Sequence, residues 1–175
     1  MNNVAAPTVE LRLLTHRPQE MVAWWAALLG GRPQSLNSRM TAITGLSLRV
    51  VIERSQIALA YHPEASGVTA VNLVLGDVPV VQRMLNRLAR LGSVPQRATR
   101  EPGAIALWVR DPNGTDVALY LPSSSARFTP EAGVLPEELH VNAVLADISR
   151  GRPVGGHGYR NGPFHTASCI DSPRQ

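Results

Sequence analysis

The chain has 175 residues, of which 44% are hydrophobic and 17% charged, so it holds enough apolar material for one packed domain and is not a disordered chain. Seventeen basic and thirteen acidic residues give a net charge of +4, and every basic residue is arginine, a bias typical of a GC-rich bacterial genome. No apolar run is long enough to span a bilayer, and the first residues lack the pattern of a secretory signal. A single cysteine excludes an intrachain disulfide. We therefore expect a cytoplasmic protein with no membrane partner.

The first half of the chain predicts a strand, then a helix, then three strands. The helix, residues 18–29, begins with Pro18 in its first turn, carries a broad apolar stripe and ends at Gly30. Trp24 and Trp25 belong to that stripe, so we assign them to the core rather than to a ligand site. Short runs of apolar residues predict strands at 9–14, 40–44, 48–53 and 57–62.

The second half repeats this order. Asp77 is a suitable N-cap for a helix at 78–91, which Gly92 ends. The segment Asp111-Pro112-Asn113-Gly114 is a turn signal and predicts a hairpin between the last two strands. The predicted strands of this half are 70–75, 96–100, 104–110 and 117–121.

The repeated order indicates an internal duplication, with units at about 9–63 and 69–122 of a domain that spans residues 1–122. Read with a period of two, one strand face is uniformly apolar and should pack under the helices. The other face mixes small and polar side chains, and its alanines leave room, which favours a cavity over a plain solvated face. The residues on that second face are Glu10, Arg12, Leu14, Ala58, Ala60, His62, Ala70, Asn72, Val74, Asp116, Ala118 and Tyr120.

Two segments carry a resemblance to a known family. Residues 24–31, Trp-Trp-Ala-Ala-Leu-Leu-Gly-Gly, and residues 111–120, Asp-Pro-Asn-Gly-Thr-Asp-Val-Ala-Leu-Tyr, resemble the vicinal oxygen chelate superfamily of glyoxalases, bleomycin-resistance proteins and extradiol dioxygenases. The resemblance implies an α+β fold in which two βαβββ units form a curved mixed sheet, a cup, with the helices on its outer face. It also implies a homodimer, because such cups commonly form within or between the chains of a dimer.

The same resemblance places metal ligands on the first and last strands of each unit, where metal-dependent members usually carry histidine or glutamate. The corresponding positions of this chain are Glu10, Ala58, Ala70 and Ala118. Alanine has no donor atom, and an ordinary catalytic metal site needs at least three protein ligands. We therefore expect no metal and no other cofactor.

The polar and aromatic side chains of the predicted cup face are the candidate ligand-binding residues. Glu10 is also the candidate catalytic residue, as a general base, although an ion pair with Arg12 explains these two residues equally well. His62 could instead be a solvated loop histidine and Tyr120 half-buried packing, and the sequence does not fix the strand register of Trp108. The candidates are Glu10, Arg12, His62, Asn72, Trp108 and Tyr120.

Five arginines cluster between positions 83 and 100, but no aromatic residues are interleaved with them. A solvated helix face explains them better than a nucleic-acid site, so we expect no nucleic-acid partner. The arginines concerned are Arg83, Arg87, Arg90, Arg97 and Arg100.

Residues 123–175 form an extension beyond the family pattern. A helix is predicted at about 135–149, with Pro136 at its start and Glu137 and Glu138 in its first turn, and we expect it to dock on the domain or on a second subunit. The stretch from 151 to 175 is rich in glycine and proline, which predicts an irregular arm that could cover the mouth of the cup.

These features favour a metal-independent protein that binds a small organic ligand, with a drug-sequestering bleomycin-resistance protein as the nearest analogue. Two other classes stay open. One is a metal-independent isomerase, lyase or cyclase that uses Glu10 and the polar residues of the cup. The other is an interaction protein whose cup is filled by its own C-terminal arm. A fold by itself does not decide among the three.

Overall fold

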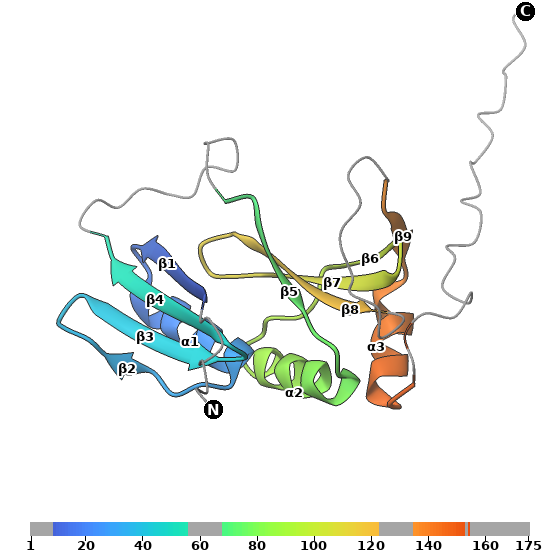
Figure 1. Cartoon of the computed structure of the whole chain (residues 1–175), viewed down its shortest axis with the longest axis horizontal. Helices are drawn as coiled ribbons and strands as arrows, with labels where there is room; N and C mark the ends of the chain where they lie inside the picture. The colour runs from blue at the N-terminus through green and yellow to red at the C-terminus, as the bar shows by residue number, and fades with distance from the viewer. Residues whose placement is uncertain (1–8, 56–67, 123–134, 153, 155–175) are drawn as a thin grey trace, which may run out of the picture.

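The structure is a computed structural model that describes residues 9–55, 68–122, 135–152 and 154. It has an α+β architecture in which two halves of similar design stand side by side, each a mixed sheet with a helix packed beneath it (Figure 1). A short strand and a third helix follow the second half. In chain order the elements are β1 (Val9–Thr15), α1 (Pro18–Leu29), β2 (Gln34–Ser35), β3 (Met40–Gly45), β4 (Leu48–Arg54), β5 (Ala70–Val74), α2 (Val78–Ala89), β6 (Arg97–Glu101), β7 (Ala104–Arg110), β8 (Asp116–Pro122), β9 (Glu137–Leu139) and α3 (Val141–Ser149).

The strands form two mixed sheets with matching topology. Their strand orders are β1-β4-β3-β2 and β5-β8-β7-β6-β9. In each half the first strand pairs in parallel with the last, β1 with β4 and β5 with β8, and a helix lies in the crossover between them. The remaining neighbours are antiparallel. The predicted α+β fold of two βαβββ units is confirmed.

The last strand of the first half differs from the expectation. The sequence pattern misses β2, which is only two residues long and has no apolar alternation, and therefore assigns the place of the last strand to residues 57–62. In the structure β4 holds that place beside β1, while 57–62, including Ala58 and His62, lie outside the described residues. The first-half counterpart of Ala118 is therefore Val51, because each pairs with the corresponding residue of the first strand in its half.

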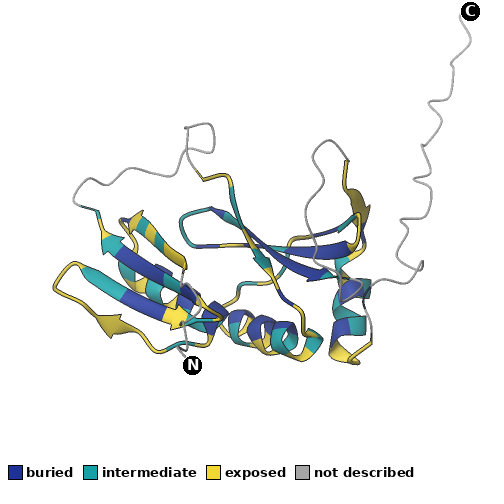
Figure 2. Cartoon of the chain, viewed as in Figure 1, coloured by how far each residue is buried: buried dark blue, intermediate teal, exposed yellow. Residues whose placement is uncertain are grey.

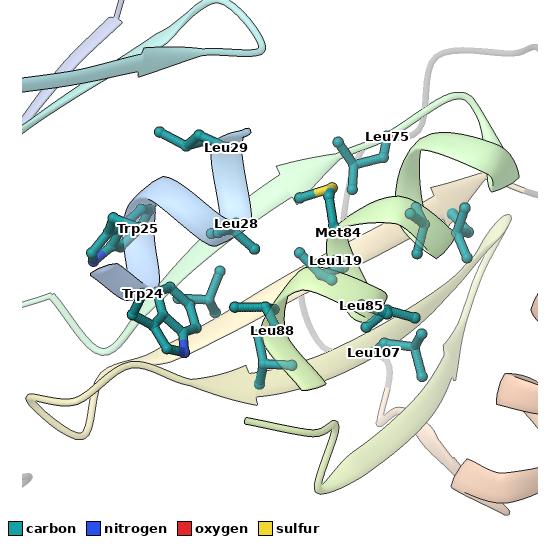
Figure 3. Packing of buried hydrophobic residues seen from close by; sticks show 14 of the residues in the cluster. Trp24, Trp25, Leu28, Leu29, Leu75, Met84, Leu85, Leu88, Leu107 and Leu119 are labelled. Atoms are coloured by element: carbon teal, nitrogen blue, oxygen red, sulfur yellow. The ribbon is translucent and has the colours of Figure 1, made fainter. Parts of the chain in front are cut away.

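One hydrophobic core serves both halves. The apolar stripes of α1 and α2 face each other and the sheets above them, as Figure 3 shows for Leu28, Leu88 and their neighbours. In Figure 2 the buried residues run along the inner sides of the helices and along the central strands. Trp24 and Trp25 are part of this core, as predicted. None of the helices in the described part of the chain is long and apolar enough to cross a membrane.

Arg87 is a structural side chain rather than part of a solvated arginine surface. Its guanidinium donates hydrogen bonds to the carbonyl oxygens of Ala27 and Leu28 at the end of α1, where carbonyls have no helical partner and a cation is favoured. Gly30, at φ 71°, ends α1 and leaves room for this contact, since a Cβ there would lie 3.1 Å from Arg87 Nη2. The second helix thus caps the first.

The predicted turn at 111–114 connects β7 to β8 and also contacts the first half. Asp111 Oδ1 accepts hydrogen bonds from the backbone N–H groups of Asn113 and Thr115, both at 2.9 Å. Asn113 Oδ1 in turn accepts a hydrogen bond from Thr15 Oγ1 at 2.6 Å. The turn therefore closes its own hairpin and holds the end of β1.

The C-terminal extension corrects the helix predicted at about 135–149. Residues 137–139 form strand β9 on the free edge of β6, and α3 begins only at Val141. The reason is that a strand places Leu139 and Glu137, two residues apart, on the same face, where Leu139 enters the core and Glu137 reaches Arg100 at 3.6 Å, whereas a helical turn would point them in opposite directions. Helix α3 packs against α2 and β6, which agrees with the expected docking on the domain. Apart from Gly151, Arg152 and Val154, the predicted arm lies outside the described residues.

Candidate functional site

The second sheet carries an apolar cluster that is separate from the main core. Because side chains alternate along β7 and β8, Leu107 and Leu119 face the helices and their neighbours face the opposite way. We call this opposite side, turned away from the helices, the distal face. Alanines on it make room for two aromatic rings to pack onto the strands. The cluster consists of Ala104, Ala106, Ala118 and Tyr120, all buried, with Trp108 packed against them and partly exposed.

The ring of Trp108 is fixed by two contacts on the distal face. Its Nε1 donates a hydrogen bond to the fully buried Thr99 Oγ1 at 2.9 Å. The guanidinium carbon of Arg97 lies 4.3 Å from the ring centroid, within the range of a cation–π interaction. Both partners belong to β6, whose register with β7 places Arg97 opposite Trp108. The result is an aromatic platform with a cation on its face.

Tyr120 lies on the same face and acts as a hydrogen-bond donor. It is 3% exposed, and its hydroxyl donates to Glu101 Oε1 at 2.8 Å. Burial, and secondly the hydrogen bond to Glu101, raise the pKa of the phenol well above its ordinary value. Tyr120 therefore stays protonated, and its burial agrees with the packing alternative considered from the sequence.

Asn72 completes the group of predicted residues that the structure brings together. Strand register places Arg97, Trp108, Ala118 and Asn72 in one row across β6, β7, β8 and β5. The Asn72 side chain is exposed at the edge of the sheet. Three of the predicted ligand-binding residues, Asn72, Trp108 and Tyr120, thus share the distal face of the second sheet.

Glu10 and Arg12 lie on the other sheet and bind each other. Glu10 Oε1 accepts a hydrogen bond from Arg12 Nε at 2.8 Å, and Glu10 Oε2 lies 3.5 Å from Arg49 Nε. The hydrogen bond from Arg12, with the charges of both arginines, lowers the pKa of the Glu10 carboxyl. A carboxylate held in this way is a weak proton acceptor at neutral pH, so the geometry favours the ion-pair alternative over a general base.

Arg97, Thr99 and Glu101 contribute to the distal face although none was a sequence candidate. A period-two reading of their strand places all three on one side, which is the available signal. That signal does not say which strand lies opposite, and Arg97 is close in sequence to the arginines of α2. His62, the remaining candidate, lies outside the described residues.

A cleft of about 510 Å³ lies elsewhere, where the 111–114 turn meets α1 and the end of α2. Its two arginines are already paired, Arg17 with Glu20 at 2.6 Å and Arg110 with Asp116 at 2.8 Å. Trp24 in its wall donates to Ser93 Oγ at 3.0 Å. The Trp24–Ser93 bond, together with the bond from Arg17 Nη1 to the carbonyl oxygen of Pro112 at 2.8 Å, joins the two halves, and we assign the cleft to that interface rather than to the candidate site.

No protein-family model and no curated protein matches this sequence. Solved structures do match its fold. A glyoxylase/bleomycin resistance protein/dioxygenase domain from Frankia sp. EAN1pec aligns with a TM-score of 0.54 and 14% identity, over 67% of this chain and 98% of that chain. A glyoxalase/bleomycin resistance protein/dioxygenase from Alicyclobacillus acidocaldarius gives a TM-score of 0.52 and 10% identity, over 66% and 90%. The chain has the glyoxalase/bleomycin-resistance fold.

A lactoylglutathione lyase from Agrobacterium tumefaciens shares this glyoxalase fold, with a TM-score of 0.50 and 18% identity over 68% of this chain and 96% of that chain. The resemblance to the vicinal oxygen chelate superfamily seen in the sequence is thereby confirmed at the level of the fold. Identities this low establish the architecture alone, so the chemistry has to be argued from the residues present.

The residues at the positions where the family resemblance places metal ligands do not have the chemistry to hold a metal ion. With β4 as the last strand of the first half, those positions hold Glu10, Val51, Ala70 and Ala118. Only Glu10 has a donor atom, and its two oxygens face arginines. In the ranges 9–55, 68–122 and 135–152, no three His, Cys, Asp or Glu side chains are grouped so that they could hold an ion.

Proposed function

We propose that this protein binds a small organic molecule on the distal face of its second sheet, without chemical change and without a metal ion. The observation that carries the proposal is the aromatic cluster of Trp108 and Tyr120 on the sheet face away from the helices. Aromatic surfaces with a few oriented polar groups are typical of small-molecule sites. Here Arg97 and Thr99 orient the ring of Trp108, and the exposed Asn72 amide lies in the same row.

The glyoxalase fold supports a function at the level of the glyoxalase/bleomycin resistance protein/dioxygenase family, and two of the similar structures carry that combined description. Glu10 is the residue that we considered as a general base. Its hydrogen bond and ion pairs with arginines lower the pKa of its carboxyl, which favours binding over catalysis. The homodimer expected from the family stays a prediction. So does the filling of the cup by the C-terminal arm.

Tryptophan signals can test the proposal, because Trp24 and Trp25 are 3% and 0% exposed and Trp108 alone is partly exposed. With ¹⁵N-labelled indoles, Trp108→Phe identifies the Trp108 signal by its loss. We expect bleomycin or the flat, neutral compound 2-naphthamide to shift that signal saturably and to leave the other two in place.

Trp108→Ala should weaken this binding by about tenfold or more, since it removes the ring and the packing around it. The matched control is Leu91→Ala, which removes another exposed apolar side chain, at the end of α2, and should leave binding unchanged. A Trp108 signal that neither compound moves, or equal binding by the native protein and Trp108→Ala, would overturn the proposal.

A further inference from the structure

Arg97 indicates which class of molecule the distal face takes. Building on the proposed function, we infer that the ligand is a planar apolar compound that carries an oxyanion, and that Arg97 binds this oxyanion while the planar part contacts Trp108. The oxyanion can be a carboxylate, a phosphate or a sulfonate, which present the same oxygen acceptors to a guanidinium.

The first observation is that the Arg97 side chain has no hydrogen-bond or ion-pair partner among the described residues. Several other strand arginines are paired with acids, as Arg12 is with Glu10 and Arg110 with Asp116. Among the described residues its guanidinium contacts the Trp108 ring, and its charge also acts on the Tyr120 phenol without a hydrogen bond between them. Its N–H donors are therefore available to a bound molecule.

The second observation is that this free cation is held in place. Its guanidinium lies 4.3 Å from the centroid of a ring that is itself tied to the buried Thr99. A restrained side chain loses less conformational freedom when a ligand binds, and a planar guanidinium offers a fork of donors that matches an oxyanion. Arg83 on α2 and Arg90 at its C-cap have no such ring contact with any residue that the structure describes.

The third observation determines how the ligand is oriented on the distal face. Strand register places Arg97 at one end of β6 and Glu101 at the other, opposite Trp108 and Ala104 respectively. The Glu101 carboxylate, bound to Tyr120, would repel an anion. The oxyanion therefore belongs at the Arg97 end, with the planar part extending over Trp108 toward Tyr120.

The test compares 2-naphthoate with 2-naphthamide, which have the same ring system and differ in charge. Binding is followed by the Trp108 indole signal and by calorimetry. We expect the native protein to bind naphthoate about tenfold or more tighter than naphthamide, since a charge-assisted hydrogen bond separates the two compounds. Arg97→Gln should bind both at the naphthamide level. Arg83→Gln, which makes the same charge change on α2, should keep the native preference.

The outcomes separate the two proposals. If the native protein binds both compounds equally at Trp108, or if Arg97→Gln keeps the preference for naphthoate, the inference about the oxyanion is wrong and the proposed binding site stands. If neither naphthoate nor naphthamide moves the Trp108 signal, the inference fails, and if bleomycin also leaves that signal in place, the proposed function fails with it. Arg97 is exposed and holds no hydrogen bond in the described part of the chain, so Arg97→Gln should fold, which its dispersed amide spectrum will verify.

Discussion

Burial and hydrogen bonding act in opposite directions on the carboxyl of Asp111. The residue is 4% exposed at the start of the hairpin turn, and its Oδ1 accepts the backbone N–H groups of Asn113 and Thr115. Burial raises its pKa, while the hydrogen bonds from the backbone lower it, and burial is the larger effect. One side chain therefore fixes the turn while its ionisation opposes folding.

This balance predicts how Asp111→Asn changes stability with pH. A raised native pKa means that the stabilisation from the protonated carboxyl is fully present below its ordinary pKa of 3.8 and is lost as pH rises through the raised value. Asparagine can still accept both N–H groups and does not titrate. The free energy of unfolding of Asp111→Asn minus that of the native protein should therefore increase from about pH 4 to about pH 7. Urea unfolding at several pH values measures it, and a flat or falling difference would contradict the argument.

Strand register limits how much of the candidate site can be predicted from the sequence. Period-two reading correctly placed Asn72 and Tyr120 on the face away from the helices. It could not place Arg97 on Trp108, because that contact depends on which residues of two strands lie opposite each other. Arg97 was grouped with its sequence neighbours on α2 for the same reason.

Among the secondary-structure elements, β9 shows why a very short strand is not predicted from the sequence. Helix α1 was predicted with its observed bounds because Pro18 starts it, Gly30 ends it and twelve residues carry the helical period. A three-residue strand carries no such period, and a proline followed by two glutamates is a common helix start. Pairing with β6, which is distant in sequence, decided the conformation instead.

Leu139→Ala tests whether β9 is anchored as the structure shows. Leu139 is 4% exposed within the main core, so its truncation should lower the free energy of unfolding by about 2–4 kcal/mol. Leu135→Ala is the matched control, because Leu135 precedes β9, is 91% exposed and should change stability by less than about 0.5 kcal/mol. Urea unfolding measures both. Equal effects of the two substitutions would mean that β9 does not dock on the core.

In the molecule as a whole, the interface between the two halves makes them one folding unit. Residues of α1, α2 and α3 share a single core, as Leu28, Leu88 and Ile148 illustrate. The Arg87 cap and the bond between Thr15 and Asn113 add polar contacts across the interface. Unfolding of either half would therefore expose apolar side chains of the helix that belongs to the other half.

The two halves should therefore unfold in a single transition. In a Trp108→Phe background, the fluorescence of Trp24 and Trp25 reports the first half, while circular dichroism reports the whole chain. We expect both signals to have the same urea midpoint. Adding Asn113→Ala, which removes the contact with Thr15, should lower the free energy of unfolding by about 1–2 kcal/mol and shift both urea midpoints down together. A tryptophan transition that separates from the dichroism signal would show that the halves unfold independently.

The contrast between the distal face of the second sheet and the corresponding face of the first sheet sets the number of ligands that one chain can hold. A duplicated fold offers two related surfaces, but the first carries the Glu10, Arg12 and Arg49 ion pairs where the second carries Trp108 and Tyr120. Strand β9 widens only the second sheet. The two halves therefore share a fold but not the side chains of a binding site. Saturation should occur at one equivalent of ligand per chain rather than at two.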